Sequence, residues 1–370
     1  MTIGGTINGL PPSTIVTISD SYNPSVPKLV SGNGNFTINY NYALMSNYYL
    51  NVVATAGVYC TVTKGQGGPL FSDVVDVVIS CIDETQSFII MGQNGLLKGS
   101  IRGLTSWNTL QIPSNLSINE AAYGVSGGNV LVGGNGAILY SANAYDWNQM
   151  WSGVSANLNS VAYINNLFIA VGENGFILSS TNGINWLVQV YDKTFNFKQI
   201  KSCGSTFYAL AISNSKSFLL SSTDGTTWNT VFSNLDGIEN SVTCSGNGNI
   251  ILAGVDGFLY STDGVTINTV PATGFTFNKV IYFQGVLYAV GTNGGSQNPG
   301  IIFTSLDNGI TWNIESQTFP NQLLSISVNN SGTFIAVTNK QYFVSLNGNT
   351  WTSGNQIFSG INNIASAESS

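Results

Sequence analysis

Apolar and polar residues alternate over short stretches of this chain, and clusters of glycine, asparagine, aspartate and serine separate the stretches. Alternation with a period of two predicts β-strands, and the clusters predict the turns between them. Residues 158–190 show the pattern well, with strands predicted over 159–164, 167–172, 176–180 and 186–190 and an Asn-Gly hairpin turn at 174–175. The first two strands are almost continuously apolar, as expected where neighbouring sheets cover both faces. Four antiparallel strands therefore form one unit.

A recurring turn sequence sets the spacing of these units. Its fullest copy is SLDNGITW at Ser305–Trp312, where we expect Asp307 to accept backbone N–H bonds and Gly309 to take a positive φ. The residues that close its seven copies are 107, 147, 186, 228, 267, 312 and 351, at steps of 40, 39, 42, 39, 45 and 39. A period near forty with four strands per unit predicts a β-propeller of seven blades over residues 83–370.

The two ends of the repeat predict how the ring closes. The first unit starts at 87–92 with a segment that matches a second strand, so its first strand is missing. Residues 361–367 (INNIASA) resemble the first strands at 119–123 and 158–163. We therefore expect the C-terminal segment to supply the innermost strand of the first blade, which removes an open sheet edge.

Residues 1–82 lack the forty-residue period and form a separate predicted domain. Short strands are predicted over 2–8, 14–19, 35–40, 48–56, 59–63 and 74–80, with turns at 11–12 and 33–34. Cys60 and Cys81 lie in the last two of these strands.

The amino-acid composition excludes several kinds of catalytic and binding site. The chain has no histidine, and Arg102 is its only arginine, so Ser–His or Cys–His catalysis, histidine metal ligation and a multi-arginine clamp are excluded. With 10 basic and 17 acidic residues the net charge is −7, which predicts no nucleic-acid partner. No apolar run has the length of a spanning helix, so no membrane insertion is expected. Neither the acidic residues nor the cysteines have the spacing of a metal site, and no cofactor is predicted.

The turns resemble the Asp-box (bacterial neuraminidase) repeat, S-x-D-x-G-x-x-W, of sialidase-like propellers. Ser305–Trp312 matches in full, whereas other copies are one residue shorter or replace the aspartate by Asn143, Asn182 or Asn347. The resemblance implies that the boxes are structural turns on the face opposite the active site. It assigns this role to Ser222, Asp224, Trp228, Ser305, Asp307, Gly309 and Trp312. The Gly-His and Trp-Asp signatures of WD-repeat propellers are missing.

The N-terminal segment resembles the small immunoglobulin-like or transthyretin-like β-sandwich modules of secreted bacterial proteins. GGTINGLP at Gly4–Pro11, GNFTI at Gly34–Ile38 and the two cysteine positions carry the resemblance. It implies a disulfide between Cys60 and Cys81; the alternative is two buried free thiols. Cys203 and Cys244 occupy nearly equivalent places in consecutive blades, where two small buried hydrophobic residues are the default interpretation and a disulfide the alternative.

A sialidase needs three arginines for the substrate carboxylate, so that activity is excluded. A glycosidase with two carboxylates would have to draw on the loop face, where Glu173, Asp192, Asp236, Glu239 and Asp256 are expected. Their spacing singles out no acid–nucleophile pair, and we interpret them as scattered surface acids.

The same face carries the longest irregular loops, where recognition residues usually lie. Aromatic rings, amides and a carboxylate there suit neutral sugars or a protein epitope, and the alternative is ordinary solvated loop. The candidate ligand-binding residues are Tyr191, Asp192, Lys193, Phe195, Asn293, Gln297 and Asn298.

The sequence thus predicts an all-β, non-enzymatic, extracellular or surface-exposed recognition protein, an adhesin or lectin-like protein that binds a cell-surface glycan or protein. No charged-then-apolar leader follows Met1, so any secretion leader was removed or never existed. The first alternative is a structural subunit or decoration protein of a phage particle or surface filament that associates through the N-terminal sandwich. The second is a glycosidase.

Overall fold

The computed structural model describes residues 1–10, 14–38, 41–54, 58–83, 88–100, 107–113, 115–124, 128–142, 144, 146–235, 237, 239–295 and 298–366. Strands dominate, with two 3₁₀ turns, η1 (Gly134–Gly136) and η2 (Glu173–Gly175). The predicted all-β class is thereby confirmed. No helix in this part of the chain is long and apolar enough to cross a membrane.

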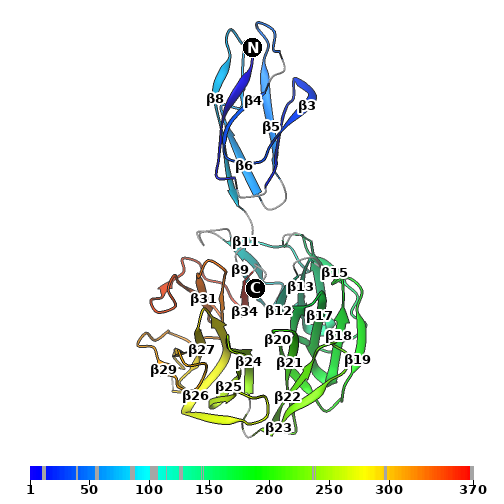
Figure 1. The fold of residues 1–370 in the computed structure, drawn as a ribbon, viewed down its shortest axis with the longest axis vertical. Coiled ribbons are helices and arrows are strands. Elements are labelled where there is room, and N and C mark those ends of the chain that lie inside the picture. Colours follow the sequence, from blue (N-terminus) through cyan, green and yellow to red (C-terminus); the bar gives the residue numbers. More distant parts are fainter. Residues whose placement is uncertain are drawn as a thin grey trace. The chain divides into compact units, whose positions relative to one another are not determined.

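The chain divides into two compact units (Figure 1). Unit one comprises Met1–Gln86 and Ser100–Ser106, and unit two comprises Ser87–Gly99 and Trp107–Ser370.

Unit one contains two four-stranded sheets. In the first, β4 (Gly34–Ile38), β1 (Ile3–Asn8), β8 (Val74–Asp83) and β6 (Val58–Thr63) lie in that order, and β1 and β8 are parallel. In the second the order is β3 (Asn23–Val30), β2 (Val16–Asp20), β5 (Tyr48–Ala54) and β7 (Gln66–Gly67). The sequence predicted neither β3 nor β7. Segment 23–30 holds two prolines, but β3 is an edge strand, and proline is tolerated there.

The two sheets of unit one share one hydrophobic core. Ile3 and Ile7 of β1 and Val16 and Ile18 of β2 are completely buried in the same cluster. Cys60 and Cys81 are directly opposite each other on β6 and β8 and form a disulfide with an S–S distance of 2.12 Å. The disulfide that the sequence resemblance implied is therefore present.

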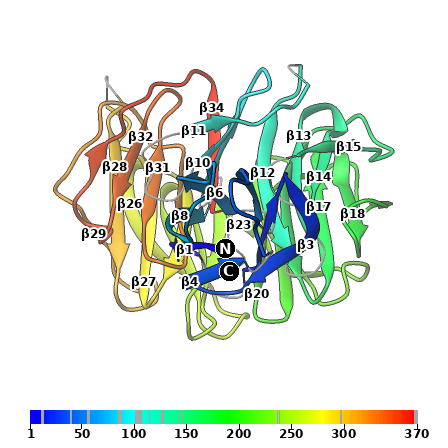
Figure 2. The same ribbon diagram turned by 90° about the horizontal axis from the view of Figure 1, so that it is seen from above.

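Unit two is built from antiparallel sheets that follow the chain from an inner to an outer strand. Four of them each consist of four strands that are consecutive in the chain. The first two sheets are β12 (Ile118–Gly124), β13 (Gly128–Gly133), β14 (Ile138–Ser141) and β15 (Asn148–Met150), and then β16 (Leu158–Ile164), β17 (Leu167–Gly172), β18 (Phe176–Ser180) and β19 (Leu187–Val190). The other two are β20 (Asn196–Cys203), β21 (Thr206–Ser213), β22 (Lys216–Ser222) and β23 (Asn229–Leu235), and then β30 (Ser325–Val328), β31 (Phe334–Val337), β32 (Tyr342–Ser345) and β33 (Thr352–Ser353). Figure 1 shows the sheets of this unit around a common centre, with β12, β20, β24 and β34 innermost, and Figure 2 shows the same strands from above.

A fifth sheet has six strands. They are β24 (Glu239–Cys244), β25 (Ile250–Ser261), β26 (Asn268–Phe283), β27 (Val286–Thr292), β28 (Gly300–Ser305) and β29 (Asn313–Ile314). The first half of β25 pairs with β24 and its second half with β26. Likewise β26 pairs first with β25 and then with β27. Two long strands thus join what the repeat predicted as two separate four-stranded sheets.

The C-terminal strand completes the remaining sheet. Its order is β11 (Trp107–Thr109), β10 (Leu97–Ser100), β9 (Phe88–Gly92) and β34 (Ile361–Ser366). Strand β34 is antiparallel to β9, with Ile364 opposite Ile90 and Ala365 opposite Ile89. The predicted pairing of the C-terminal segment with the start of the repeat is confirmed.

A second disulfide joins two inner strands of unit two. Cys203 of β20 and Cys244 of β24 have Cα atoms 6.0 Å apart and an S–S distance of 1.92 Å. The default interpretation of two free buried thiols was wrong. Sequence places both residues near the ends of consecutive inner strands but does not give the distance between those strands.

Candidate functional site

The loop that follows β19 has a rigid aromatic base. The ring of Phe195 lies 4.9 Å from that of Phe218, 5.4 Å from that of Tyr191 and 6.3 Å from that of Phe197, centroid to centroid. Two backbone bonds tie the loop to η2: Tyr191 N–H donates to the carbonyl of Gly175 at 2.9 Å, and Gly175 N–H donates to that of Phe195 at 2.7 Å. Phe195 is half-buried and supports the loop, whereas Tyr191 is exposed.

The other predicted ligand-binding residues of this loop differ in whether their side chains already form hydrogen bonds within it. One carboxylate oxygen of Asp192 accepts from both the N–H and the hydroxyl of Thr194 at 2.9 Å. These two bonds, the backbone bond first, hold the pKa of Asp192 below its usual range. Asp192 therefore caps its own turn, and the Lys193 side chain is exposed. Tyr191 and Lys193 remain the groups best placed to meet a partner.

Beside this loop lies a strip of exposed apolar side chains that sequence reasoning missed. We call Trp151, Val188 and Val190 the apolar strip; Trp151 is 85% exposed. Val188 and Val190 are two apart on the edge strand β19 and so share a face. A Cβ at Gly153 would be 3.4 Å from both the Trp151 ring and a Val188 methyl, which places these two side chains side by side. Trp151 falls outside the repeating tryptophan positions, and only that irregularity pointed to it.

The second predicted loop lies between β27 and β28. The side-chain oxygen of Asn293 accepts from Gly295 N–H at 3.2 Å, and Asn298 N–H donates to the carbonyl of Gly295 at 2.8 Å. Both asparagines are exposed, and Gln297 lies outside the described residues. Across the part of the chain that the structure describes, no hydrogen bond, ion pair or ring contact joins this loop to the one after β19.

The candidate carboxylates are dispersed. Glu173 accepts a hydrogen bond from the Asn157 amide at 3.1 Å, and Asp256 accepts one from Gly274 N–H at 2.8 Å. Each carboxylate therefore stabilises the loop structure next to it. Glu239 is almost fully buried, and burial raises its pKa to about 7. Among the described residues its Oε2 has no partner, and Asp236 lies outside them. Within those residues no three His, Cys, Asp or Glu side chains gather as a metal site would require.

The predicted structural turns use their side chains internally. Ser305 Oγ–H donates to Asp307, Asp307 accepts from Thr311 N–H at 2.8 Å, and Trp312 Nε1–H donates to the Gly309 carbonyl at 3.1 Å. The turns at Ser222–Trp228, Ser180–Trp186 and Ser345–Trp351 repeat this set, with Asn182 and Asn347 accepting as the aspartates do.

Each of these turns also packs against the preceding sheet or, for Ser305–Trp312, against the first half of the six-stranded sheet that contains it. A Cβ at Gly225, which has φ +71°, would be 2.3 Å from Ile169 of β17, so only glycine fits there. Trp312 stacks on Phe258 of β25, with ring centroids 3.9 Å apart. The turns therefore connect neighbouring sheets.

The inner strands (β12, β16, β20, β24, the second half of β26, β30 and β34) line a central channel, a cavity of about 400 Å3. A polar residue occupies the same position in each: Glu120, Ser160, Gln199, Ser241, Lys279, Ser325 and Asn363. Five of them bond to the next inner strand, as when Gln199 accepts from Val242 N–H at 2.7 Å and Asn363 donates to the Asn119 carbonyl at 2.8 Å.

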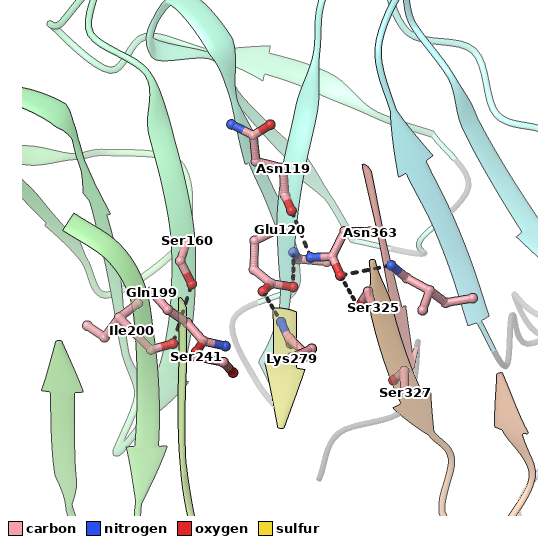
Figure 3. A network of polar contacts seen from close by, with 12 residues as sticks. Asn119, Glu120, Ser160, Gln199, Ile200, Ser241, Lys279, Ser325, Ser327 and Asn363 are labelled. Atoms are coloured by element: carbon pink, nitrogen blue, oxygen red, sulfur yellow. Dashed lines mark hydrogen bonds and ion pairs between the residues drawn. The ribbon is translucent and has the colours of Figure 1, made fainter. Parts of the chain in front are cut away.

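The remaining two polar residues pair with each other. Lys279 Nζ lies 2.7 Å from Glu120 Oε2 (Figure 3). Strands β30 and β34 separate β26 from β12 on one side, and β16, β20 and β24 do so on the other. The ion pair therefore reaches across the channel.

Comparison with known proteins shows the fold alone. No family model matches the chain, and no curated protein matches its sequence. Among solved structures, YCF48 bound to D1 peptide is similar at 17% identity and a TM-score of 0.53 over 66% of this chain and 83% of that one. A protein from Lactobacillus plantarum gives 9% and 0.60 over 75% and 98%. The Mitotic Checkpoint Complex gives 12% and 0.53 over 68% and 84%. The class of protein is thus an all-β, propeller-like one with several sheets.

Proposed function

We propose that this chain is a non-enzymatic, extracellular recognition protein that binds a protein partner through the loop after β19 and the neighbouring apolar strip. In this proposal unit one is an immunoglobulin-like sandwich and unit two a seven-bladed, Asp-box-like propeller. The six-stranded sheet counts as two blades that meet where β25 and β26 each change partner.

The observation that carries the proposal is the exposure of large apolar side chains next to a fixed loop. Trp151 is 85% exposed and lies close to Val188 at Gly153, and Val190 directly precedes the exposed Tyr191. Aromatic residues on a rigid base lose little conformational entropy on binding, and tryptophan and tyrosine dominate protein-binding surfaces. Contiguous exposed apolar groups favour a protein partner over a neutral sugar.

Two further observations support this proposal. Similar structures include one solved with the D1 peptide and one from the Mitotic Checkpoint Complex, so propeller-like folds serve protein recognition elsewhere. Two disulfides are typical of proteins outside the reducing cytoplasm, which supports an extracellular or surface location.

A peptide-display selection on the immobilised full chain tests the proposal. We expect enriched peptides whose binding is lost in the variant Trp151→Ser/Val188→Ser/Tyr191→Ser. The matched control is Val265→Ser/Leu306→Ser/Leu346→Ser, which removes three apolar side chains, each at least 75% exposed, from the opposite turns and should keep binding. Equal binding by both variants, or capture by a glycan array with no peptide enriched, would contradict the proposal.

A structural subunit is the second candidate, and exposed apolar side chains on unit one favour it. Leu29, Val53 and Val75 are 63%, 64% and 76% exposed. Under this candidate, sedimentation velocity would show concentration-dependent assembly that Val53→Ser/Val75→Ser abolishes. A monomer at all concentrations would contradict the structural-subunit candidate.

A further inference from the structure

The central channel contains a cation without a partner. Lys201 lies on β20, two residues after Gln199, and lines the cavity that also holds Glu120 and Lys279. Among the described residues no hydrogen bond or ion pair reaches its ammonium group. Its side chain is exposed to the space inside the channel, where the lining comes from all seven inner strands.

The charges inside the channel do not cancel. Two lysines and one glutamate give +2 − 1 = +1, in a chain whose net charge is −7. Enclosure by protein, and then the nearby Lys279, lower the pKa of Lys201, while Glu120 raises it. The Lys279 charge is neutralised at 2.7 Å by Glu120, so the uncompensated charge is that of Lys201.

We propose that the central channel binds a small monocarboxylate whose carboxylate group meets Lys201. A single negative charge restores neutrality among the three channel groups, whereas a dianion would leave an excess charge close to Glu120. The ammonium group binds an anion as a point charge with up to three hydrogen bonds. A volume of about 400 Å3 lies within the range of small-molecule sites.

The rest of the lining suits an organic acid better than an inorganic anion. Val161, Ile281 and Ala365 contribute apolar groups, and Ser202 and Thr243 contribute hydroxyls. An alkyl chain can therefore leave water while its carboxylate is paired. This ligand site is separate from the apolar strip at the outer edge of β19 and does not depend on it.

Titration calorimetry on the full chain with sodium butyrate and with its neutral isostere butyramide, at constant ionic strength and pH 7, tests the proposal. We expect heat of binding with butyrate alone. Lys201→Met removes the charge at similar volume and should weaken butyrate binding at least about tenfold. The control Lys340→Met changes an exposed lysine outside the channel and should leave binding unchanged.

A second variant, expected to strengthen butyrate binding, separates an effect of channel charge from a loss of binding through misfolding. Glu120→Gln raises the channel charge to +2, so butyrate should bind about tenfold tighter. Butyramide binding as well as butyrate, or Lys201→Met binding as wild type, would overturn the proposal. Sodium chloride or sodium sulfate competing on equal terms with butyrate would also overturn it, because the site would then hold any anion.

Discussion

The two ends of the strands in unit two use similar residues in different ways. At the end with the serine–aspartate turns, the side chains bond within their turn, and the glycine and tryptophan pack on the preceding sheet. At the opposite end, in the loop after β19, Asp192 bonds within the loop and Phe195 packs on Phe218. Tyr191 and Lys193 of the same loop are exposed. The repeated turns are thus structural, and in our proposal the non-repeating loop is the surface that binds a partner.

Removing the closing strand should have the largest effect. Deleting residues 360–370 takes away β34, exposes the paired edge of β9 and uncovers Ile90, which is completely buried. We expect a sharply lower melting temperature by circular dichroism. The point variant Ile364→Asp, which places a charge at a position 2% exposed, should act in the same direction. An unchanged melt would show that closure contributes little.

The buried Glu239 should make stability fall as pH rises. Its pKa is about 7 in the folded state and 4.5 in a free side chain, so between these values the folded state holds the proton that the unfolded state has lost. The free energy of unfolding should drop by about 3 kcal/mol over that interval and then level off. Urea melts at several pH values should show this drop in wild type and its absence in Glu239→Gln. The same slope in both proteins would assign the pH dependence to other groups.

Asp307→Ala should cost about 1–2 kcal/mol, because it removes the acceptor for Ser305 Oγ–H and Thr311 N–H. Asp307→Asn should cost much less, since Asn182 and Asn347 make equivalent bonds in their own turns. Equal losses in the two variants, measured by urea denaturation, would show that the charge rather than the hydrogen-bond acceptor stabilises the turn.

Tyr191→Ser should have the smallest effect on stability, within about 0.5 kcal/mol, because the ring is exposed and Phe195 keeps its contact with Phe218. Phe195→Ser is the matched comparison and should cost clearly more. A large loss for Tyr191→Ser would mean that the exposed ring belongs to the fold rather than to a binding surface.

Sequence predicted what repetition and alternation encode. The turn at Ser305–Trp312 and its copies gave the period, and the match of 361–367 to the inner strands gave the pairing of β34 with β9. Edge strand β3 was missed because two prolines obscured it, and the continuity of β25 and β26 was missed because turn residues interrupt both.

Less of the candidate sites could be predicted from the sequence, because the sites depend on distances between residues that are far apart along the chain. Glu120 and Lys279 are 159 positions apart, and only the ring of sheets brings them to 2.7 Å. Trp151 and Val188 belong to different sheets and come close to each other at Gly153, which no pattern singled out. The Cys203–Cys244 disulfide likewise depends on the spacing of two inner strands.

The most direct test of the contrast compares two variants for binding of the display-selected peptides. Trp151→Ser/Tyr191→Ser alters the loop end, and Asp307→Ala alters the turn end, and both should remain folded at 25 °C. By surface plasmon resonance we expect the first variant to lose peptide binding and the second to bind as wild type. Retained binding in the first variant together with lost binding in a folded Asp307→Ala protein would place recognition at the turns and contradict the account.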